Sequence, residues 1–422
     1  MLTRVVVLPV LAIIFLAPRA PALERHPGVF NLLHSVTVDG GENANDEARG
    51  ISVADDGTVY VTGYINVTGQ GRNLWLAKYS RELSYLDSIT INGTANGDDE
   101  GYSIVFDEDG HLYLIGYMTE AGQRHNIWLG KFDTDLLLLD SITVDGTQHE
   151  DDDGYGLLFD SESGNLYLAG TVRETGQGAN IWLAIYDVDL DQVDAITMNG
   201  PADDTDKARF LTFDDTRHLF VSGSMTDDLA RDYDIWIGKF KDDLTPVDDL
   251  TIAGPTADED KGYGIVFDGS GSLFVTGTMI ETNESYNIWM AKLDTQLNLL
   301  DSLTINGPED GEDVAYLMTR DRGGRLFHTG TYTQSASGSN IWLGCFDTAM
   351  NLHAWATVDG PASGFDTGVG VATGTADDLY VSAIVSDPVE GLNIWIGHYD
   401  ISALFVDGFE SGDTSIWQMV VP

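Results

Sequence analysis

Seven aspartates recur at near-equal spacing along the chain, each just before an apolar segment: Asp46, Asp99, Asp152, Asp206, Asp260, Asp313 and Asp366. Most stand in acidic clusters such as "GDDE" at 97–100 and "EDGED" at 309–313. Clustered carboxylates beside glycine suit a hard cation, so one expectation is a set of Ca²⁺ ligands. No complete calcium-loop motif occurs, however. The other expectation, favoured by the presence of the aspartate in every repeat, is that each carboxylate accepts backbone N–H bonds in a turn.

A second repeating position lies three residues further on. It holds Arg49, Tyr102, Tyr155, Arg209, Tyr263, Tyr316 and Val369. Phenols at one repeating position could form an aromatic platform for a sugar ring. The plainer expectation is that these side chains pack between neighbouring repeats, with their polar ends in water near a central channel.

Motifs for catalysis are sparse. The chain has no G-x-S-x-G, H-E-x-x-H, phosphate-loop or dinucleotide-binding motif, and its nine histidines do not recur in register. Two carboxylates could hydrolyse a glycoside, but with 68 acidic residues their proximity in sequence decides little. The segment "MTDDLARDYDIW" at 225–236 departs most from its relatives, since Arg231, Asp232 and Asp234 stand where other repeats have Gly and Asn.

The elements that must position these residues form a repeat with a tryptophan at a fixed place. The tryptophans are 53 or 54 residues apart, at Trp75, Trp128, Trp182, Trp236, Trp289, Trp342 and Trp395. Each repeat contains four segments of strand length, rich in β-branched and aromatic residues and bounded by Gly, Asp or Asn. Their apolar runs are nearly continuous, which indicates sheets covered on both faces. This pattern predicts an all-β fold, a seven-bladed β-propeller with four antiparallel strands per blade.

Two details refine the prediction. A small residue, Ala or Gly, follows each tryptophan by two positions, and we expect it to clear space for the adjacent blade. The last repeat lacks its fourth strand, whereas "HSVTVDG" at 34–40 matches "DSITING" at 87–93. We therefore predict that residues 35–38 pair with the blade of Trp395 and close the ring, which removes exposed sheet edges.

The segments "FDGSGSLFVTGT" at 267–278, "ADDGTVYVTGY" at 54–64 and "FDSESGNLYLAGT" at 159–171 resemble the SBBP-type β-propeller repeat of secreted bacterial proteins. The resemblance covers about residues 35–400. It implies the propeller fold and an extracellular bacterial protein, but no defined reaction. Ala383, which replaces the recurrent Gly in the seventh repeat, departs from this pattern.

The chain divides into three parts: a signal peptide at 1–22, the propeller at 30–400 and a C-terminal tail at 401–422. The first part has a positive start, a short apolar core and an "APA" cleavage site, so we expect export and cleavage, with an uncleaved anchor as the alternative. The tail segment "FVDGFESGDTSIW" resembles a tail of exported bacterial proteins, and a sorting tag or an ordered cap would both fit it. The single cysteine, Cys345, is expected to be an inert buried thiol.

The formal net charge is −47, and no basic run occurs. Nucleic acid and anionic membrane surfaces are therefore excluded as expected partners. The acidic loops and the loops between second and third strands should emerge on one face, which we expect to be the working face. The sequence favours a monomeric, exported, non-enzymatic propeller, periplasmic, extracellular or on the cell surface, that binds a protein, a glycan or Ca²⁺ there. The alternative is a secreted polysaccharide hydrolase or lyase that uses Asp or Glu at the channel mouth.

Overall fold

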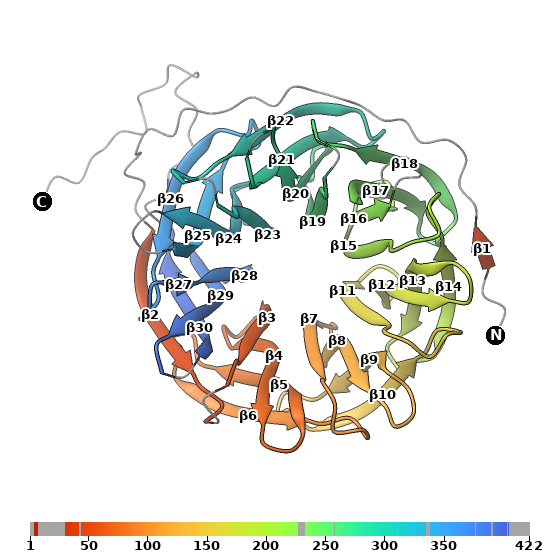
Figure 1. The fold of residues 1–422 in the computed structure, drawn as a ribbon, viewed down its shortest axis with the longest axis horizontal. Coiled ribbons are helices and arrows are strands. Elements are labelled where there is room, and N and C mark those ends of the chain that lie inside the picture. Colours follow the sequence, from red (N-terminus) through yellow and green to blue (C-terminus); the bar gives the residue numbers. More distant parts are fainter. Residues whose placement is uncertain are drawn as a thin grey trace, which may run out of the picture.

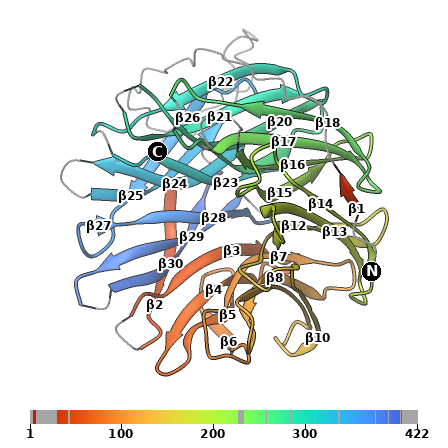
Figure 2. The same ribbon diagram turned by 45° about the vertical axis from the view of Figure 1, so that its right-hand side comes forward.

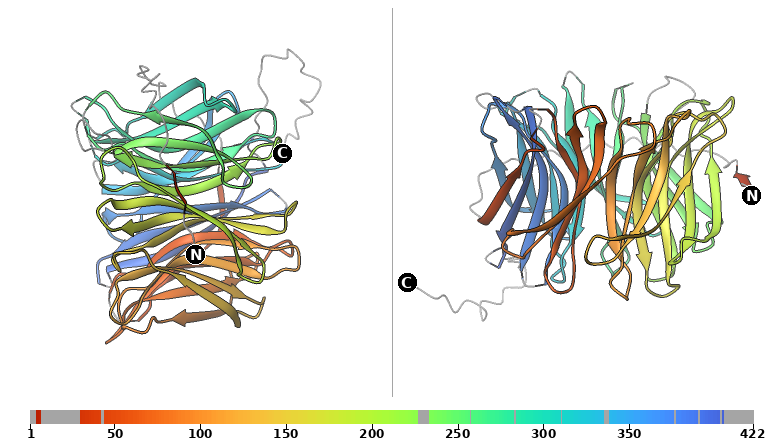
Figure 3. Two further views of the ribbon diagram at one scale, coloured as in Figure 1. Left: turned by 90° about the vertical axis from the view of Figure 1, so that its right-hand side faces the viewer. Right: turned by 90° about the horizontal axis from the view of Figure 1, so that it is seen from below.

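The predicted propeller is confirmed by the computed structural model, which describes residues 4–6, 30–41, 44–226, 233–256, 258–282, 284–309, 311–334, 338–375, 377–389, 391–402 and 404. Seven antiparallel sheets stand around a central channel (Figure 1). The described residues form no helix, and so none that could cross a membrane. Figure 2 and Figure 3 show the blades running between the two faces of the ring.

Every blade has the same strand order from the channel outward. The inner strands are β3 (Glu47–Val53), β7 (Glu100–Phe106), β11 (Asp153–Asp160), β15 (Lys207–Phe213), β19 (Lys261–Phe267), β23 (Val314–Arg320) and β28 (Thr367–Thr373). The second strands are β4 (Val59–Val67), β8 (Leu112–Thr119), β12 (Asn165–Glu174), β16 (His218–Thr226), β20 (Ser272–Ile280), β24 (Leu326–Gln334) and β29 (Asp378–Asp387).

The third strands are β5 (Gly71–Tyr79), β9 (His125–Phe132), β13 (Gly178–Asp187), β17 (Tyr233–Lys241), β21 (Tyr286–Asp294), β25 (Gly338–Phe346) and β30 (Gly391–Asp400). The outer strands are β6 (Tyr85–Ile91), β10 (Leu138–Val144), β14 (Gln192–Met198), β18 (Pro246–Ile252), β22 (Leu299–Ile305), β26 (Leu352–Val358) and β2 (Asn31–Val38). Two short strands pair in parallel outside this scheme: β1 (Arg4–Val6) with β14, and β27 (Gly364–Phe365) with β25.

Ring closure by the N-terminal strand is also confirmed. Strand β2 is antiparallel to β30, with Val36 opposite Ile396 and Thr37 opposite Trp395. The closing contact is longer than the predicted 35–38, because pairing starts at Asn31. The last and first blades also share one apolar cluster, in which Tyr380 and Ile394 pack with Trp75.

The apolar core lies between blades rather than in one central mass. Trp128 of the second blade packs with Tyr60 and Leu76 of the first, and Trp182 of the third packs with Tyr113 of the second. The expectation about the small residue after each tryptophan needs a correction. A Cβ at Gly130 would lie 2.1 Å from the ring of Trp128 in the same strand. In the four blades with glycine at this place, the small residue thus makes room for its own blade's indole, which packs on the preceding blade.

Four lysines add polar links between blades. Lys78, Lys131, Lys239 and Lys292 occupy equivalent places on third strands, and each ammonium donates to a backbone carbonyl of the next blade at 2.7–2.8 Å. Cys345 takes this place in the sixth blade, where it is fully buried and burial raises its thiol pKa to about 12. A thiol with so high a pKa stays protonated at neutral pH, as expected for an inert residue.

We predict that removal of residues 31–38 leaves β30 as an open edge, so that the protein melts at lower temperature and self-associates. Melting curves and light scattering after size exclusion measure both effects. A synthetic peptide of residues 30–40 should restore the wild-type melt when added in trans. A truncated protein that melts and elutes like the wild type would contradict closure by β2.

Candidate functional site

Each of the seven recurring aspartates joins two blades. In the second blade, Asp99 Oδ2 accepts the N–H of Gly93 at 2.6 Å, and Oδ1 accepts the N–H of Thr119 at 2.7 Å. The Asp99 N–H donates to the carbonyl of Arg72 at 2.9 Å. Gly93 and Arg72 belong to the first blade and Thr119 to the second. One residue therefore ties the loop between blades to strands on both sides of it.

The same three bonds recur in all seven blades. The glycine six residues before each aspartate donates to one oxygen, and the residue twenty positions after it (twenty-one in the third blade, where Arg173 is the donor) donates to the other. A Cβ at Gly93 would stand 2.5 Å from the carbonyl oxygen of Thr119 and 2.8 Å from Asp99 Oδ1, so only glycine fits there. The recurrent "G" before each acidic loop is thus part of the same hydrogen-bonded arrangement.

Each of the seven aspartates is at most 1% exposed, and none is among the residues that line the channel pocket. Desolvation by burial raises the carboxyl pKa of Asp99 and Asp206 to about 6 and that of Asp152 and Asp260 to about 7, although the two backbone N–H donors oppose the shift. Burial also raises the pKa of Asp46 and Asp366.

Calcium binding stays a prediction. Within the described residues, no group of three or more His, Cys, Asp or Glu side chains is placed to hold a metal ion. The seven carboxylates face backbone N–H groups, whose positive ends suit an anion and leave poor room for an added cation. Arg231 and Asp232, the divergent residues of the fourth blade, lie outside the described residues, whereas Asp234 is buried in β17.

A β-bulge follows each aspartate on the inner strand. In the second blade, pairing shifts between Gly101 and Ser103, which leaves Tyr102 as the extra residue. A shift begins at the same position in every inner strand, although in β3 and β19 it also includes the following glycine, Gly50 or Gly264. Each shift includes the residue three positions after the aspartate: Arg49, Tyr102, Tyr155, Arg209, Tyr263, Tyr316 or Val369. Bulges re-aim a side chain, and here they aim seven of them into the channel.

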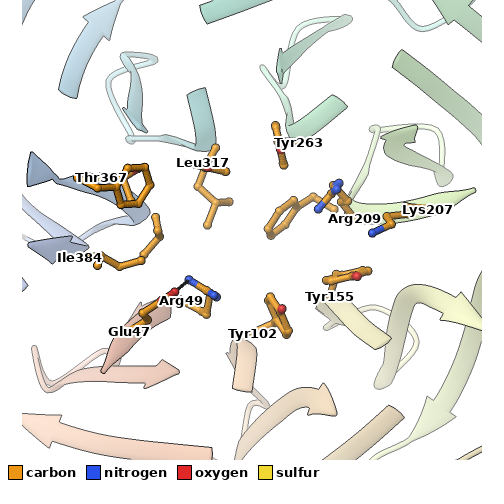
Figure 4. A pocket seen from close by; sticks show the side chains of 14 residues that line it. Glu47, Arg49, Tyr102, Tyr155, Lys207, Arg209, Tyr263, Leu317, Thr367 and Ile384 are labelled. Atoms are coloured by element: carbon orange, nitrogen blue, oxygen red, sulfur yellow. Dashed lines mark ion pairs between the residues drawn. The ribbon is translucent and has the colours of Figure 1, made fainter. Parts of the chain in front are cut away.

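These seven residues together line a pocket of about 410 Å³ in the channel. Its other lining residues are Glu47, Lys207, Phe210, Leu317, Phe365, Thr367 and Ile384. Figure 4 shows that the pocket is asymmetric: Lys207 and Arg209 lie on one side, and Leu317, Thr367 and Ile384 on the other. Twelve of the fourteen lining residues lie in the first half of the inner strands, directly after the acidic loops, so the pocket lies toward the predicted working face.

The aromatic and charged side chains of the pocket contact one another. The rings of Tyr102 and Tyr155 meet edge to face at 5.0 Å, as do those of Tyr263 and Tyr316. Burial raises the pKa of Tyr102, Tyr155 and Tyr316 above that of a free phenol, so these groups stay neutral at physiological pH. The expected packing of this position between blades beside the channel is present, and the platform for a sugar ring stays a prediction.

Arg49 is bound by two carboxylates. Its guanidinium lies 2.8 Å from Glu47 and also pairs with Glu100, which accepts the hydroxyl of Tyr117 at 2.9 Å. Glu47 is the one carboxylate among the lining residues, and this pairing occupies it. Glu47 and Lys207 were not among the residues expected from the sequence. A signal existed: both occupy the position directly after the recurring aspartate, two residues from the bulge.

Comparisons with known proteins add nothing beyond the fold. No family model and no curated protein sequence matches the chain, so membership of the SBBP family stays a prediction. The solved structures with similar folds include the periplasmic gluconolactonase of Pseudomonas aeruginosa, with 10% identity, a TM-score of 0.49, and coverage of 79% of this chain and 94% of that one.

Two further solved structures have similar folds, each with 10% identity. The β-propeller domain of the Trilobed protease from Pyrococcus furiosus has a TM-score of 0.47, with coverage of 86% of this chain and 99% of that one. The acylaminoacyl peptidase of Pyrococcus horikoshii has a TM-score of 0.43, with coverage of 81% and 51%. Likenesses this distant carry no argument about activity.

We predict that Asp99→Ala destabilises the protein by at least about 2 kcal/mol, because two buried N–H groups lose their acceptor and each such loss costs about 1–3 kcal/mol. Denaturant titration measures the loss. The neighbouring variant Asp98→Ala is the control, since that side chain is half exposed and its removal should cost under about 0.5 kcal/mol. Equal effects of the two substitutions would contradict the structural role of Asp99.

The raised carboxyl pKa values predict a pH dependence with a definite sign. Because the folded carboxyls of Asp99, Asp152, Asp206 and Asp260 bind protons more tightly than the ordinary value of 3.8 allows, protonation favours the fold. The free energy of unfolding should therefore fall as pH rises from about 4 to about 7. High salt screens surface repulsion and should leave this trend in place. Stability that rises over that window would contradict it.

Proposed function

We propose that this protein is an exported, non-enzymatic binding propeller that takes its ligand at the channel pocket on the acidic loop face. The observation that carries the proposal is the set of seven bulges. A bulge breaks sheet pairing at a cost, and a closed ring does not need seven of them at one level. Each bulge places a side chain in the same pocket, which is the geometry of a binding site on a rigid scaffold.

The chemistry of the lining favours binding over proton transfer. Glu47 is held by Arg49, so the general acid and base pair of a glycosidase has no free carboxylate to start from among the lining residues. The phenols of Tyr102 and Tyr155 stay neutral. Tyrosine faces and neutral hydroxyls instead suit the ring of a bound molecule, such as a terminal unit of a glycan or a side chain of a protein partner.

The surface supports the remaining parts of this proposal. A net charge of −47 opposes binding to nucleic acid and to anionic membranes. The acidic loops around the pocket would repel anionic surfaces and keep a monomer soluble. Export to the periplasm, cell surface or medium rests on the segment 1–22, which lies outside the described residues apart from 4–6.

A polysaccharide hydrolase or lyase is the second candidate, and one observation favours it. The pKa of Lys207 is lowered to about 8, mainly by burial, and an amine with such a pKa can accept a proton near neutral pH. A screen of neutral and acidic polysaccharides for product formation separates the candidates. The binding proposal predicts no turnover, and turnover that Lys207→Met abolishes would replace it with the enzyme.

We predict that a library of neutral and acidic oligosaccharides, screened by native mass spectrometry, contains a ligand that the wild type binds and that Tyr263→Ala binds roughly tenfold more weakly, because an aromatic contact surface is lost. Tyr85→Ala is the matched control, since Tyr85 is exposed on the outer strand β6. If no library member depends on Tyr263, the pocket is not the binding site.

A further inference from the structure

Two cations in the channel, Lys207 and Arg209, form no ion pair with a carboxylate of the described residues, in a chain with 68 acidic and 21 basic residues. Arg49 pairs with Glu47 and Glu100, and Lys261 pairs with Glu259 at 2.6 Å. Among the described residues, no carboxylate lies within ion-pair distance of Lys207 or Arg209. Acidic residues are abundant in this chain. That two adjacent cations form no ion pair with the described residues is therefore a specific property of this pocket.

Within the described residues, the guanidinium of Arg209 does not use all of its N–H donors. Its guanidinium lies over the ring of Tyr263 at 4.6 Å and 5.4 Å from that of Tyr155. Its Nε is buried and has no hydrogen-bond partner. A buried donor without an acceptor costs free energy, and it marks a place where an acceptor from outside the chain would be stabilised.

Lys207 stands beside it on the same strand. Its ammonium lies 5.9 Å from the ring centre of Tyr155, and no hydrogen bond from it is formed within the described residues. Asp153, whose charge acts on Lys207, already accepts the Tyr155 hydroxyl at 3.0 Å and lies 3.8 Å from His125. The pocket therefore presents an ammonium and a guanidinium in a partly dehydrated site, and neither is ion-paired to a carboxylate of the described residues. Asp153 and Glu259 act on Lys207 only from beyond ion-pair distance.

We propose that the channel pocket binds an organic carboxylate, whose anionic group lies between Lys207 Nζ and the Arg209 guanidinium. A planar carboxylate matches the guanidinium fork. The opposite wall, with Leu317 and Ile384, suits a less polar body (Figure 4). A volume of about 410 Å³ limits that body to one or two rings. This assignment rests on the proposed function, because it names the ligand class of the same pocket.

The charge of Lys207 should make binding depend on pH. Burial, then Arg209 on the same strand, Lys261 from β19 and Arg173 from β12 lower its pKa to about 8, while Asp153 from β11 opposes them. Tyr155, which also faces this group, has its pKa raised by burial and stays neutral near that pH, and Glu259, from the loop before β19, also interacts with the Lys207 charge. Affinity for a carboxylate should therefore be full below about pH 8 and fall as pH rises above it, because the amine loses its charge.

The test measures binding of benzoate and glucuronate by calorimetry, each against its uncharged counterpart, benzyl alcohol or glucose, with inorganic phosphate as a third arm. We expect at least one carboxylate to bind at least about tenfold more tightly than its counterpart. Lys207→Met should remove this preference, and Lys207→Arg should retain it while losing the pH dependence. Lys241→Met, which removes an exposed lysine on β17, is the control and should bind like the wild type.

A stability readout applies whether or not a variant binds. Since burial and its cationic neighbours outweigh Asp153 and destabilise the charged form of Lys207, Lys207→Met should raise the melting temperature of the ligand-free protein. A drop would assign the lysine a structural role and overturn the proposal. Binding of phosphate but of neither carboxylate would overturn the organic ligand class. Binding of the neutral compounds alone would overturn the anion site and leave the proposed function standing. If no compound binds in a way that depends on Tyr263, both the anion site and the proposed function are wrong.

Discussion

The buried bond between an aspartate carboxylate and two backbone N–H groups is the interaction on which the rest of this structure depends. It occurs once per blade, and its three contacts fix the path of the chain as it crosses from one outer strand to the next inner strand. The channel side chains are set by that crossing, because each inner strand begins directly after the aspartate. A carboxylate in this place costs desolvation, as the raised carboxyl pKa values show. The fold accepts that cost because a buried N–H without an acceptor would cost more.

The bulge that follows turns a structural repeat into a varied surface. The fold requires only that the residue three positions after the aspartate project into the channel, so the type of this residue can differ between blades. Tyrosine fills it in four blades, arginine in two and valine in one. The result is a pocket with a cationic side at Lys207 and Arg209 and an apolar side at Leu317 and Ile384. The aspartates, which are the same in every blade, stabilise the ring. The channel residues, which differ between blades, determine the shape and charge of the pocket.

The sequence alone predicted the seven blades, the strand order and the closure by the N-terminal strand, because the 53-residue tryptophan period and the displaced "HSVTVDG" segment are local patterns. It also identified the ring aspartates and the seven positions that face the channel. It did not predict the bulges, since the extra residue is defined by a partner strand and not by its own neighbours. For the same reason Lys207 received no attention: that no carboxylate of the described residues is ion-paired with it is visible only from the three-dimensional arrangement. The role of the small residue after each tryptophan was misassigned, because spacing shows which positions share a face but not which way an indole turns.

The claim that the seven aspartates hold the scaffold, and not a metal, has a direct test. Melting curves of the mature protein are recorded in EDTA, in millimolar CaCl₂ and in NaCl of matched ionic strength. The account predicts the same melting temperature in CaCl₂ and in the NaCl control, because both oxygens of each carboxylate already accept backbone N–H bonds. A calcium site occupied at a hundred times its dissociation constant would add about 2.7 kcal/mol. A melting temperature raised by CaCl₂ to that extent, and lost again in Asp99→Ala, would contradict the account.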